Sequence, residues 1–336
     1  MNVATTRCPN GDETGFLRNI WREAFGSSDV EAFFTHMFDS NRCIVVVNEG
    51  APVSAGYLLP AGTLRCKRTS VPCAMIYGVA TLPEYRSRGY GASIVRKLIS
   101  TGWNLGFPAV AICPSEASLF DYYSKCAGFR EWFFINERRY IEAEISNHKA
   151  IATKITPDEY FKLRESLLVC IPHIMSDISV ISYQQELCRE LGGGLFKFDT
   201  SGGQACAIVE RQPSGEVCVK ELLSNILLTT GVGEGNDSEA EVLSWIVSAF
   251  PASEIIVRTP VRLNNRYDDR LDSRSDFIRE TDASGSKEIQ RHTPNTEQVR
   301  SFGMLVLSDT LFVPPESLIC FGSFKPPGSW FGLALD

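Results

Sequence analysis

Residues 77–98, Y-G-V-A-T-L-P-E-Y-R-S-R-G-Y-G-A-S-I-V-R-K-L, decide how this chain folds. The segment begins as an apolar strand, passes through a tight loop and continues as an amphipathic helix of about four turns. The apolar stripe of this helix consists of Ile94, Val95, Leu98 and Ile99. At the junction of loop and helix, Arg86, Gly89 and Gly91 form the pattern R-x-x-G-x-G.

The chemistry of this junction favours a phosphate ligand. Glycines allow the backbone to approach a ligand closely and to adopt positive φ angles. The first N–H groups of a helix have no partner within it, and the helix dipole attracts an anion there. Arg86 and Arg88 add charge-assisted donors. A P-loop is excluded because no G-x-x-x-x-G-K-[ST] is present, and a dinucleotide fingerprint would need G-x-G-x-x-G after the first strand of a βαβ unit.

Working outward, the same order of elements occurs twice: helix, helix, strands, helix, strand. In the first half we predict helices at 16–25, 29–38 and 118–127, and strands at 42–48, 51–62, 63–70, 71–82, 108–113 and 129–145. In the second half we predict helices at 157–169, 182–191 and 239–250, and strands at 195–199, 205–212, 216–223, 253–260 and 302–309. Residues 264–300 have no clear element. The repetition predicts a structural duplication with a boundary near 146–156.

Composition and charge limit the class of protein. Of the 336 residues, 44% are hydrophobic and 22% are charged, which is typical of a globular chain. No stretch is long and apolar enough to span a bilayer, and the N-terminus lacks the apolar core of a secretory signal, so we expect a cytoplasmic protein without a membrane partner. Residues 1–150 carry 16 basic and 14 acidic side chains, and residues 151–336 carry 17 and 26. This acidic balance argues against nucleic acid as a partner.

The eleven cysteines are interpreted as reduced thiols of the core. Their number is odd, no C-x-x-C pair occurs, and several lie in apolar runs such as 109–113. A zinc ribbon is therefore not expected, and we predict no bound metal.

Two motifs together resemble those of the GCN5-related N-acetyltransferase (GNAT) superfamily. Residues 79–91, V-A-T-L-P-E-Y-R-S-R-G-Y-G, resemble its acetyl-CoA pyrophosphate loop. Residues 109–129, A-V-A-I-C-P-S-E-A-S-L-F-D-Y-Y-S-K-C-A-G-F, resemble the strand, helix and terminal G-F that follow it. The duplicated outline and P-S-E are similar to tandem-GNAT proteins of the enhanced-intracellular-survival type, although this chain is too short for their extra C-terminal region.

The resemblance implies an α+β (α/β/α) protein of two tandem GNAT-like domains, each with a mixed, mostly antiparallel sheet flanked by helices. Residues 1–148 would be the catalytic domain, and residues 149–336 a degenerate copy that helps form the acceptor pocket. Acetyl-CoA would be the acyl donor and a small amine or peptide amine the acceptor; a homo-oligomer is possible. The residues implied in donor binding are Val79, Ala80 and Thr81 for the pantetheine arm, Arg86, Ser87, Arg88, Gly89, Tyr90, Gly91 and Ala92 for the pyrophosphate, and Ser115 at the border.

The resemblance also implies a catalytic acid, usually a tyrosine in the helix after the fifth strand. Tyr123 is the first choice and Tyr122 the second, because C-A-G-F carries one residue more than the usual spacing. In an alignment on S-E, Phe120 takes the tyrosine position instead.

The base is open, since the fourth strand contains no Glu. Glu116 and the terminal carboxylate of Asp336 are the leading candidates. Weaker ones are Glu23, Asp29, Glu31, His36 and Glu84.

Two alternatives to amine acetylation stay open: transfer from another acyl or aminoacyl donor, and a CoA-binding regulatory module without turnover. In the second half, residues 230–241 contain a further glycine-rich run before a helix, but its four acidic side chains and lack of Lys or Arg argue against a second phosphate site.

Overall fold

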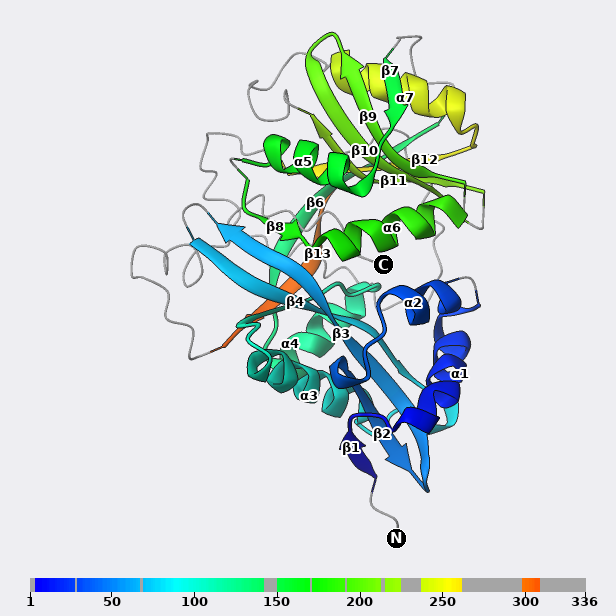
Figure 1. Cartoon of the computed structure of the whole chain (residues 1–336), viewed down its shortest axis with the longest axis vertical. Helices are drawn as coiled ribbons and strands as arrows, with labels where there is room; N and C mark the ends of the chain where they lie inside the picture. Colours follow the sequence, from blue (N-terminus) through cyan, green and yellow to red (C-terminus); the bar gives the residue numbers. More distant parts are fainter. Residues whose placement is uncertain are drawn as a thin grey trace, which may run out of the picture.

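The computed structural model describes residues 4–27, 29–66, 69–141, 150–169, 171–190, 192–212, 215–224, 237–261 and 298–308. Within these residues, the strands form one 13-stranded mixed sheet with helices on both faces (Figure 1). We call residues 4–141 the first half and residues 150–308 the second half. The predicted α+β class with helix-flanked mixed sheets is confirmed.

After the short strand β1, which was not predicted, the first half begins with two helices and ends in a strand, as predicted. Its elements are β1 (Thr5–Arg7), α1 (Thr14–Phe25), α2 (Val30–His36), β2 (Cys43–Asn48), β3 (Ala51–Cys66), β4 (Thr69–Thr81), α3 (Tyr90–Asn104), β5 (Ala109–Ile112), α4 (Ala117–Ala127) and β6 (Arg130–Tyr140). Three short 3-10 turns are η1 (Gly11–Glu13), η2 (Ser40–Arg42) and η3 (Pro83–Tyr85).

The second half repeats this order with two differences: the strand β8 lies between its first two helices, and no described helix lies between its last two strands. Its elements are β7 (Ile151–Lys154), α5 (Pro157–Leu167), β8 (His173–Ser176), α6 (Ile178–Glu190), β9 (Gly194–Thr200), β10 (Gly203–Arg211), β11 (Val217–Ser224), α7 (Asp237–Ala249), β12 (Ile255–Pro260) and β13 (Gln298–Leu307). None of the described helices is long and apolar enough to cross a bilayer.

The strand pairing confirms the predicted duplication. In the first half, β2, β3 and β4 pair antiparallel and β4 pairs parallel with β5. In the second half, β9, β10 and β11 pair antiparallel and β11 pairs parallel with β12. Each half therefore contains one parallel strand pair, and the helix between those two strands is α3 or α7.

The two halves are joined by an exchange of their last strands. β13, from the end of the second half, lies between β5 and β6, and β6, from the end of the first half, lies between β13 and β12. All these contacts are antiparallel. The domain boundary expected at 148/149 stays a prediction, but the sheet of the first half includes β13 from far along the chain.

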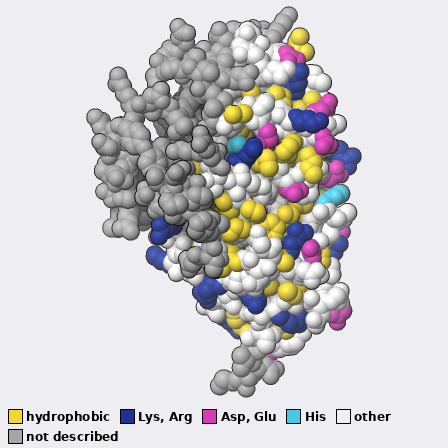
Figure 2. Space-filling view, turned by 60° about the vertical axis from the view of Figure 1, so that its left-hand side comes forward, with side chains coloured by type: hydrophobic (Ala, Val, Ile, Leu, Met, Phe, Trp, Pro, Cys, Tyr) yellow, Lys and Arg dark blue, Asp and Glu magenta, His cyan; other side chains and the backbone are white. Residues whose placement is uncertain are grey.

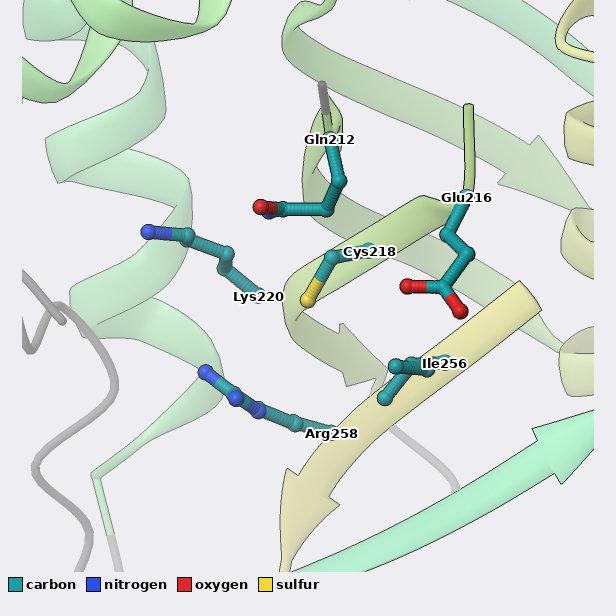
Figure 3. A pocket seen from close by; sticks show the side chains of 6 residues that line it. All are labelled: Gln212, Glu216, Cys218, Lys220, Ile256 and Arg258. Carbon is teal, nitrogen blue, oxygen red and sulfur yellow. The ribbon is translucent and has the colours of Figure 1, made fainter. Parts of the chain in front are cut away.

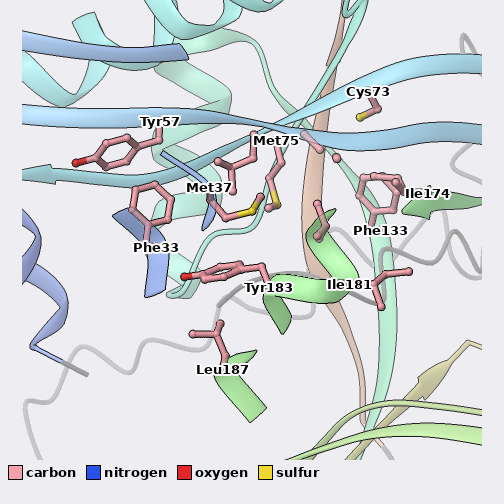
Figure 4. Close-up of a cluster of buried hydrophobic side chains, with 14 of the residues drawn as sticks. Phe33, Met37, Tyr57, Cys73, Met75, Phe133, Ile174, Ile181, Tyr183 and Leu187 are labelled. Carbon is pink, nitrogen blue, oxygen red and sulfur yellow. The ribbon is translucent and has the colours of Figure 1, made fainter. Parts of the chain in front are cut away.

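The helices sort into three cores. α1 and α2 of the first half and α5 and α6 of the second half lie on the shared inner core, where α2 contacts α6 (Figure 4). α3 and α4 cover the other face of the first half, and α7 covers the other face of the second half. The ends of β4 and β5 therefore have α3 and α4 on one face and the inner core, with α1 and α2, on the other.

β3 differs from the sequence prediction. We expected two strands, 51–62 and 63–70, but β3 is continuous over 16 residues with a register shift between Pro60 and Gly62. Gly62 has a φ of +124°, and a Cβ there would lie 2.1 Å from the carbonyl oxygen of Met175 in β8. Glycine is required because β8, from the second half, pairs with β3 at this point.

The cysteines behave as predicted where the structure describes them. None of the nine described cysteines forms a disulfide, and six are buried. Burial raises the pKa of Cys73 and of Cys188 to about 12, so these thiols stay protonated and unreactive at neutral pH.

Candidate active site

The candidate site begins where β4 and β5 part. The two strands pair in parallel from Cys73–Ala109 to Ile76–Ile112. β5 then ends, whereas β4 continues to Thr81. No described strand pairs with this edge of β4 beyond Ile76. Apart from the Thr81 carbonyl, which accepts from Arg86, the backbone of residues 78–81 therefore has no described strand on this edge, and an extended ligand could pair there, as in strand addition.

A bulge distorts β4 at this same place. Ala55 pairs with Ala80 and Tyr57 pairs with Tyr77, so the register shifts around Gly78. Gly78 has a φ of +59°, and a Cβ there would lie 2.8 Å from the Trp21 ring. Only glycine fits this backbone. The bulge therefore takes backbone groups of β4 out of the regular ladder with β3. We call the space beyond the end of β5, beside residues 78–81 of β4, the opening.

The loop after β4 has a left-handed backbone at two residues. After η3, Ser87 has a φ of +61° and Gly89, the N-cap of α3, has a φ of +79°. The first backbone bond of the helix runs from the Ser93 N–H to the Gly89 carbonyl, at 3.1 Å. The N–H groups of Tyr90 to Ala92 precede it and have no intrahelical acceptor. This end of α3 therefore attracts an anion.

Two arginines shape the loop and add positive charge to it. The Arg86 Nε donates to the Thr81 carbonyl at 3.1 Å, and Arg88 donates to the Glu84 carbonyl at 2.9 Å. The Arg88 guanidinium also lies over the Tyr85 ring. Both arginines are exposed. Figure 2 shows further Lys and Arg side chains over the lower part of the molecule, where the first half lies.

The two candidate tyrosines have different surroundings. Tyr123 is 8% exposed and packs in the α3/α4 core beside Phe129. Burial raises its pKa to about 12. Tyr122 is 39% exposed, and a Cβ on Gly91 would lie 3.1 Å from its hydroxyl. Burial also raises the pKa of Tyr122. The side chain of α4 that faces the loop is therefore Tyr122.

Ser115 and Glu116 lie where the sequence analysis expected them, directly after β5. Both are exposed, and Glu116 is the N-cap residue of α4. Its carboxylate accepts from the Ser118 hydroxyl at 3.4 Å. Glu116 therefore borders the opening with only a weak hydrogen bond holding its carboxylate.

The other candidate bases are dispersed. Glu31 forms ion pairs with Arg18 and Arg22 on the surface. Glu23, His36 and Glu84 are exposed. Asp336 and residues 262–297 lie outside the described residues, as does most of the acidic glycine-rich run. Within the described residues, no group of three His, Cys, Asp or Glu side chains is arranged to bind a metal.

Sequence reasoning missed an aromatic wall on the inner face of the opening. Trp21 of α1 stacks on Phe33 of α2, with ring centroids 4.3 Å apart, and both contact Tyr57 of β3 and Tyr77 of β4. Figure 4 shows Tyr57 and Phe33 packed beside Tyr183 of α6. The Trp21 Nε1 and the Tyr57 hydroxyl are buried without a hydrogen-bond partner. The alternation of β3 and β4 and the apolar face of α1 were the signals available.

Comparison with protein families agrees with this geometry. Residues 7–126 match the family model described as an acetyltransferase (GNAT) domain. The first half is therefore an acetyltransferase domain of the GNAT type, and both the predicted resemblance and the predicted enzyme class are confirmed. A comparison with curated proteins found no match.

Solved structures share the fold over most of the chain. A probable N-acyltransferase of Enterococcus faecalis is similar with a TM-score of 0.61 and 11% identity, covering 91% of this chain and 73% of that one. A GCN5-related N-acetyltransferase of Anabaena variabilis has a TM-score of 0.59 and 14% identity over the same shares. Eis1 of Mycobacterium abscessus has a TM-score of 0.54 and 10% identity, again over the same shares. At these identities the likeness concerns the fold alone.

Proposed function

We propose that the protein transfers an acetyl group from acetyl-CoA to a primary amine of a small molecule or peptide. The observation that carries the proposal is the glycine-containing N-terminus of α3, placed at the end of β4 beside the opening between β4 and β5. An anion-binding helix end and a free strand edge are the two features that a nucleotide-linked, extended thioester needs. The match of residues 7–126 to the GNAT domain supports this donor.

Donor binding follows from the local geometry. The pyrophosphate would accept from the N–H groups of residues 87–92, with Arg86 and Arg88 adding positive charge. The free edge of Val79, Ala80 and Thr81 would pair with the amides of the pantetheine arm. Ser115 would border this arm where β5 ends. Residues 1–148 are then the catalytic domain, and residues 149–336 close the acceptor side.

The reaction would be direct attack. The amine nitrogen forms a bond to the thioester carbon, the carbonyl oxygen becomes an oxyanion, and the C–S bond breaks to release the thiolate. A backbone N–H of β4 at the Gly78 bulge is the candidate donor to that oxyanion. The amine proton leaves to a base, for which Glu116 and Asp336 are the candidates, and an acid protonates the thiolate.

Tyr122 is the better placed of the two acids. Its hydroxyl faces the donor loop, whereas Tyr123 is enclosed in the α3/α4 core. A raised pKa suits an acid, because the phenol keeps its proton at neutral pH until the thiolate appears. The sequence-based first choice, Tyr123, remains the alternative.

A matched pair of variants tests the proposal. Gly91 is the second residue of α3, and Gly15 is the second residue of α1, exposed and with open space around it. Gly91→Glu places a carboxylate in the anion site, whereas Gly15→Glu adds the same group to an equivalent helix position elsewhere. The parent and Gly15→Glu should release free CoA thiol with an amine panel and gain about 2.7 kcal/mol of stability at 100 times the donor Kd.

Gly91→Glu should lose both signals while unfolding at the same temperature as Gly15→Glu without ligand. Binding of acetyl-CoA without thiol release from any amine would instead favour a CoA-binding module. If the protein binds CoA but turns over only longer acyl-CoA or aminoacyl donors, the assignment of acetyl-CoA as the donor would be wrong. No binding to the folded parent would contradict the proposal. A cytoplasmic location, where acetyl-CoA is available, is part of the same proposal.

A further inference from the structure

The charged side chains around the cavity of the second half are engaged within the fold. This cavity, of about 230 Å³, lies beside β11 and β12 (Figure 3). The Lys220 ammonium lies 3.2 Å from the Glu210 carboxylate, and the Arg258 guanidinium lies 3.1 Å from the Glu137 carboxylate. These charges therefore belong to the scaffold, and the cluster that bears on the reaction lies between α3 and α4 of the first half.

Arg96 connects α3 to the C-terminal end of α4. The two helices lie side by side on one face of the first half (Figure 1). The Arg96 guanidinium donates from Nη1 to the Cys126 carbonyl oxygen at 3.1 Å. This carbonyl lies in the last turn of α4, where carbonyl groups lack donors within the helix and form the negative end of its dipole. The hydrogen bond therefore fixes the end of α4 against α3.

Tyr122 lies one helical turn before this contact. Tyr122 and Cys126 are four residues apart, so their side chains share one face of α4. The Tyr122 hydroxyl is directed at α3, because a Cβ on Gly91 would lie 3.1 Å from it. Tyr123 instead packs beside Phe129 in the core between α3 and α4. A small rotation of α4 would therefore move the Tyr122 hydroxyl away from the donor loop.

The titratable and charged groups around Tyr122 come from α3 and α4. The ring of Tyr123 lies 5.2 Å from that of Tyr122, between centroids. The other groups are Arg96 of α3, Cys126 of α4 and the exposed ion pair of Asp121 with Lys125 on α4. Burial raises the pKa of Tyr122, and the Cys126 thiol adds to this effect, whereas the Arg96 guanidinium opposes it. A phenol with a lower pKa gives up its proton more readily, so Arg96 makes Tyr122 a stronger acid than burial alone would leave it.

We propose that Arg96 is a positioning residue for the reaction, which orients Tyr122 through the Cys126 carbonyl and places a positive charge beside the phenol. This inference rests on the proposed function, in which Tyr122 is the general acid. The hydrogen bond to α4 keeps the hydroxyl directed at the donor loop. When the O–H bond of Tyr122 breaks and the S–H bond of CoA forms, the guanidinium stabilises the phenolate that is left.

Arg96→Met and Lys97→Met test the proposal as a matched pair, since each removes one positive charge from neighbouring exposed positions of α3. Arg96→Met should lower kcat about tenfold, because a small displacement of a reacting group is costly, and should leave the KM for acetyl-CoA within about twofold. Arg96→Lys should restore most of kcat, since it keeps the charge and a donor. Lys97→Met should behave as the parent. An unchanged kcat in Arg96→Met, or a raised KM alone, would overturn the proposal.

A double-mutant cycle separates positioning of Tyr122 from a general structural effect. In the Tyr122→Phe background, Arg96→Met should have no further effect on kcat, because Arg96 acts through the missing hydroxyl. The melting temperatures of Arg96→Met and Lys97→Met should agree within a few degrees. A tenfold loss of kcat in both backgrounds would overturn the role of Arg96 as a positioning residue of Tyr122.

A titration of tyrosine absorbance measures the same link without turnover. The difference between a protein and its Tyr122→Phe variant isolates the Tyr122 phenol, over the pH range in which circular dichroism is unchanged. This titration should move to higher pH in Arg96→Met, since the cation that favours the phenolate is gone, and should stay in place in Lys97→Met. An unshifted phenol in an active protein would overturn the role of Arg96 alone, whereas a parent without acetyl transfer would contradict the proposed function itself.

Discussion

The two halves share one topology but use the helix after their third antiparallel strand differently. In the first half, α3 follows Arg86, Arg88 and the N-cap Gly89, and its first N–H groups have no acceptor within the helix. In the second half, the first turns of α7 contain Glu239 and Glu241. The backbone is thus repeated, whereas the charge at the helix N-terminus is reversed.

The acidic residues of α7 serve the fold. Glu239 accepts from Arg138 at 3.0 Å and from the Tyr140 hydroxyl at 3.2 Å, both on β6. Glu241 accepts from the Ser201 backbone N–H at 3.0 Å. A phosphate at this end would be repelled by both carboxylates. The comparison teaches that one helix position of the shared topology can carry either a helix end that attracts anions or acidic side chains that bond to the sheet and to the neighbouring turn.

The largest expected effect is on the buried ion pair of the second half. Arg164 of α5 is fully buried, its Nε lies 3.0 Å from the Glu221 carboxylate, and it also donates to the Ile174 carbonyl of β8 at 2.9 Å. Arg164→Met leaves the Glu221 charge buried and should cost about 3–5 kcal/mol of unfolding free energy in urea. Arg189→Met, at a side chain 71% exposed, is the control and should cost little. A loss below 1 kcal/mol in Arg164→Met would refute the scaffold role.

The next effect separates the two tyrosines of the first half. Tyr122→Phe should lower kcat about 100-fold, the range of a lost general acid, whereas Tyr123→Phe should change it less than twofold. Because burial raises the pKa of Tyr122, its protonated form persists to a higher pH than that of an ordinary tyrosine, and the alkaline decline of kcat should be shifted to higher pH accordingly. Steady-state kinetics at several pH values measures both. If Tyr123→Phe lowers kcat more than Tyr122→Phe does, the general acid would instead be Tyr123.

A smaller effect tests the structural role of α7. Glu239→Gln removes the charge from two hydrogen bonds to β6 and should cost about 1.5 kcal/mol of stability. Acetyl-CoA affinity should stay within twofold of the parent, since α7 belongs to the scaffold. Glu131→Gln, at an exposed position of β6, is the matched control. If Glu239→Gln changed the affinity for acetyl-CoA but not the stability, α7 would not have the purely structural role that we assign to it.

The smallest effect concerns acid stability at the junction of the halves. The folded-state pKa of Glu137 lies below the ordinary value of 4.5. The ion pairs of Glu137 with Arg258 and Arg300 hold this pKa down. They therefore contribute fully to stability above the unfolded-state pKa, and this contribution is lost as the pH falls through the folded-state pKa. Glu137→Gln should be less stable than the parent at pH 7 and should decline less between pH 5 and pH 3. Equal slopes for both proteins, measured by urea unfolding, would count against this role.

Sequence reasoning predicted the elements that have a strong hydrophobic periodicity or that end at a clear glycine or proline signal. The apolar stripe of α3 was visible in the residues, and the helix predicted before the terminal G-F is α4, which ends at Gly128 with a φ of +72°. The strands β1, β7 and β8 were missed because three or four residues show too little alternation to be recognised. β3 was predicted as two strands because Pro60 and Gly62 are typical of a turn. In the structure they form a bulge, and β8 pairs with β3 from Gly62 onward.

The long-range features were beyond a single sequence. The placement of β13 between β5 and β6 depends on pairing across more than 150 residues, which no local pattern encodes. The phosphate-type loop was predictable because its glycines and arginines are consecutive. The choice between Tyr122 and Tyr123 was not, since neighbouring helix residues point about 100° apart and the rotation of α4 is set by its packing.

The most direct test of the account is the stoichiometry of acetyl-CoA binding, measured by isothermal titration of the parent, Gly91→Glu and Gly15→Glu. If the first half alone keeps a donor site, the parent and Gly15→Glu bind one acetyl-CoA per chain and Gly91→Glu binds none. Two molecules per chain, or one molecule that still binds to Gly91→Glu, would contradict the claim that the α3 end is the donor site and the second half is its scaffold.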